Sequence, residues 1–539
     1  MKYNGGESIV ANILLVYPPE IHFESMTYPA FKCQSLGLYI LTSCLRGADH
    51  QVTIMDSQVD SFTIDGVIKQ IQQVKFNLIG VSFTSQLNYQ DARILVKRIR
   101  QVRYDNHITV GGHFATFEAK NILLDNPGID SVICGEAEES IIELANCIDS
   151  GVSLIGINGI TINNNGNIIE NESRTSIINL NSIPFPARDV ITKLVESNDY
   201  VQVAAQRGCY GNCTFCSINS FYDFHGVRRR SPKNVVEELE SLQYEYGAKK
   251  ITFVDDEFCD RSKESIEWVK ELTSEISSRN LTFDFWIQIR ANDFKEEVIN
   301  PLVNVGLKRV FIGIESMSQN VLNRLNKKVK ISDNTYALNL ANKLGLETEI
   351  GFLMFEPYIS FSDLYENYNW ISLYEFSEPV HYYSYVIPYS GTPLRKQLLA
   401  EGHLIASRWY EIGFYKFIDP KVEVVFKGMQ ALMPQIRHIE YALDCIINHF
   451  HQKENYENIS KIMDHCNTKP ISTNQEIELS ARKSVHNTMS TVFGKYLSAN
   501  SDNIKPLISE NITLLNSVSN ELIALKKSLE PNKGKDFLQ

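Results

Sequence analysis

Short apolar runs alternate with stretches of helical periodicity between residues 10 and 135. The runs are rich in Ile, Leu and Val, which is typical of parallel strands buried on both faces. Strands are expected at 13–17, 52–56, 78–83, 108–110 and 131–134, and helices at 36–46, 64–73 and 88–102. Strands and helices in alternation predict an α/β fold with an open, Rossmann-like sheet, whose ligands bind beyond the carboxyl ends of the strands.

The ends of these predicted strands carry small and polar residues. A glycine pair after a strand is also compatible with a simple turn, so each position alone is a weak signal. Together they are the candidate ligand-binding residues of the first region, namely Ser82, Thr84, Gln86, Gly111, Gly112, His113, Gly135 and Glu136.

A second alternation of strands and helices follows residues 179–188, where two prolines within three residues disfavour regular structure and predict a linker. Ser231 and Pro232 are typical of a helix N-cap and first turn. Strands are expected at 201–205, 250–256, 283–288, 310–315, 349–354 and 381–386, and helices at 262–278 and 333–344. This pattern predicts a partial (β/α)6 barrel of TIM type, with its chemistry at the carboxyl ends of the strands.

The last part of the chain is mainly helical in pattern and carries no recognisable motif. Residues 409–425 are expected to cross over and cover the barrel mouth, and the helices to act as a lid or docking surface. Helices are expected at 427–453, 455–465, 474–499 and 506–528. We therefore divide the chain into domains at 1–190, 191–405 and 406–539.

The composition is that of a globular protein able to bury large cores, with 43% hydrophobic and 22% charged residues among 539. The net charge of −12 argues against non-specific binding to nucleic acid or to anionic membranes. The ten cysteines are scattered, which favours a reduced, cytoplasmic protein. The start lacks the apolar core of a signal peptide, and no apolar run is long enough to span a bilayer.

One short stretch carries the strongest chemical signal, since Cys209, Cys213 and Cys216 follow the spacing C-x3-C-x2-C. Three thiolates aimed at one point suit a [4Fe-4S] cluster with one iron left open. The alternatives are a zinc knuckle or unpaired structural cysteines. Zinc would need a fourth ligand, and the nearest candidates, His225 and Cys259, do not complete a second C-x2-C pair.

The motifs of the first region resemble those of the cobalamin-binding domain that precedes some radical SAM domains. They are Tyr-Pro-Pro at 17–19, Leu-Gly-Leu-Tyr at 36–39, Ile-Met-Asp at 54–56, Gly-Val-Ser at 80–82, Val-Gly-Gly-His-Phe-Ala-Thr at 110–116 and Gly-Glu-Ala-Glu at 135–138. The Asp-x-His-x-x-Gly motif that supplies a cobalt ligand in other cobalamin proteins is not found after the first strand. The resemblance therefore implies cobalamin without a histidine on its lower face, and leaves open a domain that binds no cobalamin.

The cysteine loop, Phe-Val-Asp-Asp at 253–256, Gly-Ile-Glu-Ser at 313–316 and Tyr-Ser-Gly-Thr-Pro-Leu at 389–394 together resemble the cobalamin-associated branch of the radical SAM family. The resemblance implies that the three cysteines bind the cluster and that its open iron binds S-adenosyl-L-methionine, which is cleaved to a 5'-deoxyadenosyl radical. It also implies an external one-electron reductant of the flavodoxin or ferredoxin type.

The resemblance suggests further contacts to S-adenosylmethionine. Phe215 would contact adenine, with core packing as the alternative, and Asp255 or Asp256 the methionyl ammonium, with a solvated strand end as the alternative. The full candidate set is Phe215, Asp255, Asp256, Gln288, Arg290, Glu315 and Gly351.

Two further clusters have competing interpretations. The basic run at 228–230 suits a contact with a cofactor phosphate or a solvated turn better than nucleic acid, because the chain is acidic overall. The tyrosines at 382, 383, 385 and 389 suit a substrate cavity or buried packing in a barrel strand.

The sequence thus predicts a cobalamin-dependent radical SAM enzyme that methylates an unactivated carbon of a small molecule or peptide natural product. A cyclase, rearrangement or oxidation enzyme with the same cofactors is the first alternative. A non-catalytic cobalamin or iron-sulfur regulator is the second, and the intact cysteine triplet argues against it.

Overall fold

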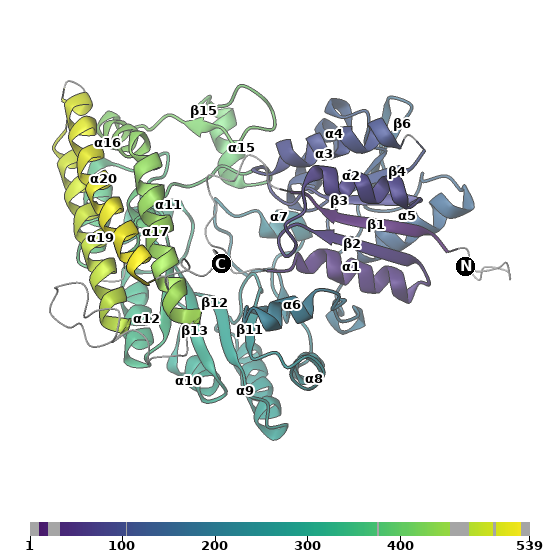
Figure 1. The fold of residues 1–539 in the computed structure, drawn as a ribbon, viewed down its shortest axis with the longest axis horizontal. Coiled ribbons are helices and arrows are strands. Elements are labelled where there is room, and N and C mark those ends of the chain that lie inside the picture. Colours follow the sequence, from purple (N-terminus) through teal and green to yellow (C-terminus); the bar gives the residue numbers. More distant parts are fainter. Residues whose placement is uncertain are drawn as a thin grey trace, which may run out of the picture.

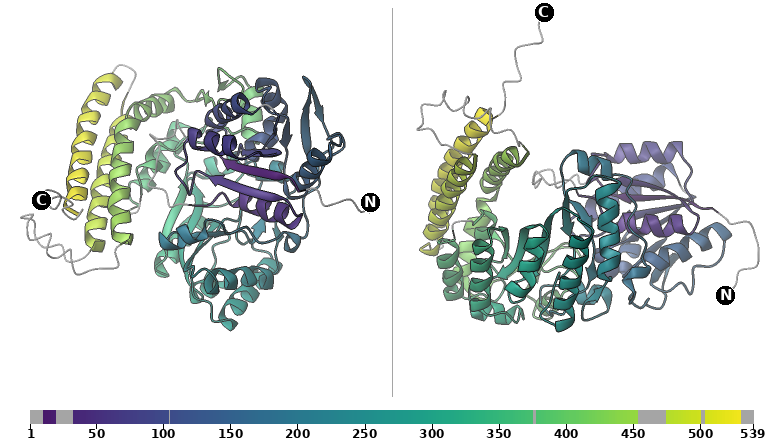
Figure 2. Two further views of the ribbon diagram at one scale, coloured as in Figure 1. Left: turned by 45° about the vertical axis from the view of Figure 1, so that its right-hand side comes forward. Right: turned by 90° about the horizontal axis from the view of Figure 1, so that it is seen from below.

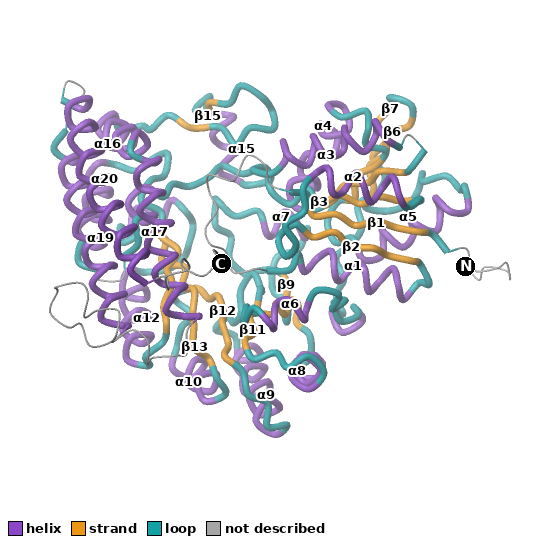
Figure 3. Tube along the Cα trace, viewed as in Figure 1, coloured by secondary structure: helices purple, strands orange, loops and turns teal. Residues whose placement is uncertain are grey.

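The computed structural model describes residues 10–19, 33–103, 105–374, 377–452, 474–499 and 503–529. It contains an N-terminal sheet, a central sheet and a group of C-terminal helices (Figures 1 and 3). The C-terminal helices lie at one end of the molecule and the N-terminal sheet toward the other (Figure 2). The α/β class expected from the sequence is confirmed.

The N-terminal sheet has the strand order β2-β1-β3-β4-β5-β6-β7. Its first five strands are parallel and each ends within one residue of the sequence prediction. The connection after β1 leads to β2 on one side, and the connection after β2 leads back past β1 to β3 on the other side. A topological switch point therefore lies between the carboxyl ends of β1 and β3. These strands are β1 (Asn12–Tyr17), β2 (Gln51–Asp56), β3 (Leu78–Ser82), β4 (His107–Gly111) and β5 (Ser131–Ile133).

Helices cover both faces of this sheet. In β1, Leu14 and Val16 pack toward α2, α3 and α4, whereas Ile13 and Leu15 pack toward α1 and α5, as the alternation of side chains along a strand requires. Buried on both sides, the strand is apolar throughout. The helices are α1 (Leu36–Gly47), α2 (Ile64–Gln73), α3 (Tyr89–Val102), α4 (His113–Asp125) and α5 (Glu138–Ser150).

Two antiparallel strands that the sequence did not predict extend this sheet, β6 (Ile160–Asn164) and β7 (Asn167–Glu170). They form a hairpin whose turn residues, Asn165 and Gly166, both have positive φ. Two successive residues of this kind are typical of a tight two-residue hairpin turn. The predicted linker, 179–188, is irregular apart from the short 3-10 helix η2 (Leu180–Ser182), and α6 (Ile191–Glu196) follows it.

The central sheet is parallel and has the strand order β14-β13-β12-β11-β8. Ser231 caps α8 as predicted, because its hydroxyl accepts a hydrogen bond from the backbone N–H of Asn234. The strands are β8 (Val201–Val203), β11 (Lys250–Phe253), β12 (Asp284–Arg290), β13 (Leu307–Glu315) and β14 (Glu347–Phe352). The principal helices are α8 (Pro232–Tyr244), α9 (Lys263–Ser278), α10 (Glu296–Asn304), α11 (Gln319–Arg324), α12 (Ile331–Lys343) and α13 (Phe361–Ile371).

The predicted strand at 381–386 was wrong. The chain forms the short helix α14 (Val380–Tyr383) there, and only an isolated parallel bridge joins Tyr385 to Phe355 beyond β14. The run of aromatic residues has high β propensity, but it packs against C-terminal helices and this tertiary environment decides its structure. The barrel therefore has five paired strands and a residual sixth position.

The C-terminal helices share one continuous hydrophobic core with the central sheet. Phe355, Phe426 and Phe493 meet within this core, with ring centroids 5.2 and 6.0 Å from Phe355. The helices are α15 (Pro393–Ala400), α16 (Pro420–Ala431), α17 (Met433–Gln452), α19 (Asn474–Leu497) and α20 (Ile504–Leu529). The helix expected at 455–465 lies outside the described residues, and the domain boundary at 405 stays a prediction.

Among the described residues, no helix combines the length and the apolar character that crossing a membrane requires.

Candidate functional site

The three cysteines lie in a loop whose two ends are held together by a pair of short strands. Strands β9 (Gln206–Arg207) and β10 (Arg228–Arg229) pair antiparallel, and residues 208–227 form the loop between them. Gly208 has φ +89°, and a Cβ there would lie 2.3 Å from the carbonyl oxygen of Gly226. Only glycine fits this position, because the two ends of the cysteine loop meet backbone to backbone.

Donors point at the sulfurs of this loop. An Arg290 Nη donates to Cys213 Sγ over 3.4 Å, and the N–H of Gly211 donates to Cys209 Sγ over 3.2 Å. Burial, with a smaller contribution from Glu257, raises the pKa of the Cys209 thiol to about 12, and burial raises the pKa of Cys216 to about 11. Iron that binds here must displace the thiol protons, and the donors then stabilise the thiolates.

No group of three or more His, Cys, Asp or Glu side chains in the described part of the chain is close enough together to hold a single metal ion. The three cysteines are thus not arranged as a mononuclear site. Three thiols in one loop match the ligand type of an iron-sulfur cluster, whose irons are each bound by a separate thiolate.

Three consecutive acids after β11 hold the backbone around the cysteine loop. Asp255 accepts hydrogen bonds from the N–H groups of Ala205 and Gln206 over 2.7 and 2.8 Å. Asp256 accepts from the N–H of Gly208 over 2.8 Å, and Glu257 from that of Arg290 over 3.1 Å. Burial raises the pKa of Asp255 to about 8.

Of the two aspartates predicted to meet the methionyl ammonium, Asp255 is fully enclosed by protein. One of its carboxylate oxygens has no hydrogen-bond partner. Its contacts make it part of the scaffold that carries the cysteine loop, and neither a solvated strand end nor an open pocket surrounds it.

The other predicted S-adenosylmethionine residues lie near the carboxyl ends of the strands. The amide of Gln288 donates to the carbonyl of Asp255, and Glu315 is paired with Lys327. A Cβ at Gly351 would lie 2.8 Å from the ring of Phe311, so this glycine makes room for a side chain of the protein. Phe215 is half-buried and packs against the central core.

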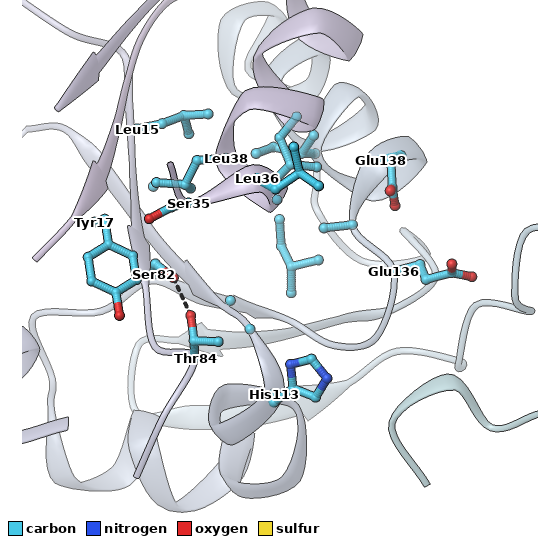
Figure 4. Close-up of a pocket in the computed structure, with 18 of the residues that line it drawn as sticks. Leu15, Tyr17, Ser35, Leu36, Leu38, Ser82, Thr84, His113, Glu136 and Glu138 are labelled. Carbon is cyan, nitrogen blue, oxygen red and sulfur yellow. Dashed lines mark hydrogen bonds between the residues drawn. The ribbon is translucent and has the colours of Figure 1, made fainter. Parts of the chain in front are cut away.

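A pocket of about 450 Å³ opens at the carboxyl ends of the N-terminal strands, beside α1 and α5 (Figure 4). It includes residues of both β1 and β3, and therefore lies at the topological switch point. Seven of the eight residues predicted for this site line it, which are Ser82, Thr84, Gly111, Gly112, His113, Gly135 and Glu136. The eighth, Gln86, lies elsewhere.

One wall of this pocket comes from the cysteine loop and its flanking strand. Arg207, Phe221 and Tyr222 line the pocket although they belong to the central region. The ring of His113 stacks on Phe221 with centroids 3.7 Å apart. Burial lowers the pKa of His113 to about 4, so this imidazole is neutral near pH 7. The two candidate cofactor sites are thus in direct contact through side chains.

Gln34 lines the same pocket and was missed in the sequence. Its side chain is 1% exposed, and neither its amide oxygen nor its amide nitrogen has a hydrogen-bond partner. An unpaired buried amide is costly unless a ligand completes its hydrogen bonds. Cobalamin carries carboxamide and phosphate groups that suit such a side chain, so the pocket fits this cofactor. Gln34 was missed because a single glutamine before a helix belongs to no sequence pattern that indicates a binding site.

The basic run at 228–230 is neither a solvated turn nor a phosphate site. Each arginine pairs with a carboxylate: Arg228 with Glu136 over 2.7 Å, Arg229 with Asp260 over 2.6 Å, and Arg230 with Glu238 over 2.5 Å. Two of the partners are distant in the sequence, since Glu136 lies 92 residues from Arg228 and Asp260 lies 31 residues from Arg229, so the run itself gave no sign of these pairs.

A second contact between the regions involves Gln86, which donates to the carbonyl of Tyr410 and accepts from the N–H of Ser390. Tyr410 and the adjacent Trp409 pack against Tyr89, with ring centroids 5.2 and 5.3 Å from it. The segment that carries α15 and the hairpin of β15 (Leu404–Ile405) and β16 (Phe414–Tyr415) therefore reaches across to the N-terminal sheet (Figure 1).

Three of the four tyrosines, Tyr382, Tyr383 and Tyr385, make packing contacts within the protein. Tyr382 is buried beside His486 of α19, and Tyr383 donates to the carboxylate of Glu440 over 2.8 Å. Tyr385 stacks on Phe414. These contacts match the packing interpretation, because they join the central sheet to the C-terminal helices.

The chain matches two family profiles, "B12 binding domain" over residues 26–145 and "Radical SAM superfamily" over residues 203–371. An uncharacterized methyltransferase of Pyrococcus horikoshii is 29% identical over 77% of this chain and 88% of that protein. An anaerobic magnesium-protoporphyrin IX monomethyl ester cyclase of Rubrivivax gelatinosus is 27% identical over 57% of this chain and 56% of that protein.

Two solved structures share the fold. OxsB, a cobalamin-dependent radical enzyme solved with aqua-cobalamin and S-adenosylmethionine, has a TM-score of 0.78 at 17% identity over 98% of this chain and 82% of its own. TsrM, a radical S-adenosylmethionine methyltransferase from Kitasatospora setae, has a TM-score of 0.62 at 14% identity over 96% of this chain and 100% of its own.

Proposed function

Because this chain belongs to the radical SAM enzymes that carry a B12-binding domain, with a [4Fe-4S] cluster, S-adenosylmethionine and cobalamin as cofactors, we propose that it is a C-methyltransferase. The proposed substrate is a small molecule or peptide natural product with an unactivated carbon. The observation that carries the proposal is the shared wall between the pocket of the B12-binding domain and the cysteine loop, formed by Arg207, Phe221 and Tyr222. A methyl donor and a radical source that act on one carbon must lie side by side.

The cofactors supply the chemistry, which is one-electron cleavage of S-adenosylmethionine and storage of a methyl group on cobalt. The chain supplies placement. We propose that Cys209, Cys213 and Cys216 bind the cluster, while Arg290 stabilises the Cys213 thiolate through its hydrogen bond of 3.4 Å. Asp255 and Asp256 hold the N-terminal end of the cysteine loop in place. A flavodoxin or ferredoxin is the proposed electron donor.

Glu315 and Gln288 are the proposed contacts to S-adenosylmethionine at the strand ends. Both side chains are held by hydrogen bonds within the protein, to Lys327 and to the carbonyl of Asp255. Such second contacts fix the orientation of a binding group before the ligand arrives.

A second candidate is a cyclase or rearrangement reaction with the same cofactors. The similarity to an enzyme named as a cyclase favours it. That reaction would consume S-adenosylmethionine only for radical generation, whereas methyl transfer also needs a methyl group for each turnover.

The distinguishing experiment is anaerobic reconstitution with iron, sulfide, cobalamin, a low-potential reductant and S-adenosylmethionine. Methyl transfer predicts equal amounts of 5'-deoxyadenosine and S-adenosylhomocysteine in the presence of a substrate. Deoxyadenosine without S-adenosylhomocysteine would favour the second candidate. Neither product across a panel of candidate substrates would contradict both.

A further inference from the structure

The base of the cysteine loop is tied to the B12-binding domain by a group of four buried charges. Arg207 donates from its two terminal nitrogens to Glu136 and Glu138, each over 2.6 Å. Arg228, directly opposite Arg207 in the β9–β10 pair, donates to the other oxygen of Glu136 over 2.7 Å. We call Glu136, Glu138, Arg207 and Arg228 the interdomain clamp.

The interdomain clamp is enclosed by protein. The side chains of Arg228 and Glu136 are 3% and 5% exposed, and those of Glu138 and Arg207 are 9% and 14% exposed. Tyr222 lies under the Arg228 guanidinium, with the ring centroid 4.8 Å away. The two positive and two negative charges compensate one another only while the two domains are in contact. Separation of the domains would leave buried charges without partners, which is costly.

The segment just before the linker is held by the same side chains. The N–H of Ile177 donates to Glu136 over 2.8 Å, and Arg228 donates to the carbonyl of Ile177 over 2.7 Å. Glu136 therefore joins three segments: the chain after β5, the segment just before the linker and the hairpin that carries the cysteines.

We propose that the interdomain clamp is the positioning device that sets the cysteine loop against the B12-binding pocket. Glu136, Glu138 and Arg207 line that pocket, and Arg207 lies two residues before Cys209. Because Glu136 contacts both sides, a shift of the loop must break charged hydrogen bonds between buried groups. The role assigned to the four side chains is positioning, because they act through the placement of the cysteine loop. This inference rests on the proposed function only in taking cobalamin as the occupant of the pocket.

Arg228→Lys is the test variant, since Arg228 does not line the pocket. Arg228 reaches Glu136 and the carbonyl of Ile177 from one terminal nitrogen. Lysine keeps the charge but loses the planar guanidinium that lies over the ring of Tyr222 and sets the position of that nitrogen. The matched control is Glu139→Gln, which breaks the pair of the exposed Glu139, the residue next to Glu138 in α5, with Arg174. Glu138→Gln is the second test variant and keeps an acceptor oxygen for Arg207.

The first measurement needs no turnover. In protein loaded with both cofactors and reduced, the relaxation of the cob(II)alamin electron spin reports its separation from the reduced cluster. We expect Arg228→Lys and Glu138→Gln to change the microwave power at half-saturation, and Glu139→Gln to leave it as in the parent. Unchanged relaxation in a folded, fully loaded Arg228→Lys protein would overturn the proposal. If that variant does not fold or load, unchanged relaxation in a folded, fully loaded Glu138→Gln protein would overturn the proposal.

The second measurement is the amount of methylated product per 5'-deoxyadenosine. Displacement of reacting groups by about 1 Å lowers rates up to about a hundredfold. We expect this ratio to fall about tenfold to a hundredfold in Arg228→Lys, while deoxyadenosine formation stays within about twofold. If relaxation changes but the parent protein forms no methylated product, the interdomain clamp stands and the methyltransferase assignment fails. An equal fall of both products would instead indicate general damage and count against a positioning role.

Discussion

Lys327 and Glu315 form a buried ion pair at the carboxyl end of β13, with Nζ and Oε1 2.7 Å apart. Their side chains are 6% and 12% exposed. Glu315 has φ +62°, a left-handed conformation that is uncommon for a residue other than glycine. The lysine thus holds the carboxylate that we propose as a contact to S-adenosylmethionine.

Lys327→Met should leave this carboxylate buried without a partner. Loss of one member of a buried pair costs about 3–5 kcal/mol of stability, so we expect a fall of this size in the free energy of unfolding. The double variant Lys327→Met/Glu315→Gln should recover part of it. Guanidinium unfolding of both proteins measures the change, and a loss below about 1 kcal/mol in the single variant would contradict a buried pair.

Cys213→Ala should abolish the cluster. Its sulfur is buried and accepts from Arg290, whereas Cys259, also buried, bonds with Ser265 and lies outside the cysteine loop. We expect iron and acid-labile sulfide after reconstitution to fall to background in Cys213→Ala and to remain as in the parent in Cys259→Ala. Equal iron contents in the two variants would refute the ligand assignment.

Gly112→Ala should damage the B12-binding pocket. Gly112 has φ +115°, and a Cβ there would lie 2.9 Å from the Cα of Thr84, so either the backbone or the start of α4 must move. We expect cobalamin to bind at least about tenfold more weakly, which is about 1.4 kcal/mol. Absorbance titration measures the dissociation constant.

The control for this substitution is Gly47→Ala near the end of α1, where an added Cβ meets nothing within 4 Å. Alanine is the better helix former, so stability and cobalamin affinity should be retained there. Normal affinity in Gly112→Ala would argue against cobalamin in this pocket.

His381 should make the protein lose stability in acid. Burial lowers its pKa to about 4 from an ordinary value of 6.5. Between these values the unfolded chain binds the proton and the folded protein does not, so stability is full above pH 6.5 and is lost as the pH falls toward 4. The shift corresponds to about 3 kcal/mol over the whole window.

The check compares the free energy of unfolding at pH 7 and pH 4.5 in the parent protein and in His381→Gln. Other groups titrate in both proteins, so the difference between the two slopes isolates this histidine. We expect a shallower loss in the variant, and identical slopes would contradict the assignment.

Local patterns predicted most of the fold. The N-terminal strands end within one residue of their expected positions because buried parallel strands are apolar throughout and are separated by helices of clear periodicity. The β6–β7 hairpin was missed because its polar, asparagine-rich sequence resembles a loop. The strand at 381–386 failed because packing against α16 and α19, far along the chain, overrides β propensity.

The candidate site divides in the same way. The cysteine spacing and most of the pocket residues were predicted, since each lies in a short motif or at the end of a strand. Gln34 was missed because a lone glutamine carries no pattern. Asp255 was predicted to face a ligand or solvent. The sequence around an acidic residue at a strand end is the same whether its side chain faces a ligand or the backbone of the protein.

By itself, the sequence determined the two sheets, the cysteine loop and the cofactors they imply, because these follow from periodicity, glycine positions and ligand spacing within short segments. Only the tertiary structure decided that Glu136 meets Arg207, 71 residues later, and Arg228, 92 residues later. Such pairs depend on how two separately folded sheets are placed against each other. No local sequence pattern encodes that placement, because an arginine can pair with any carboxylate. Which carboxylate it meets is decided only when the domains pack together.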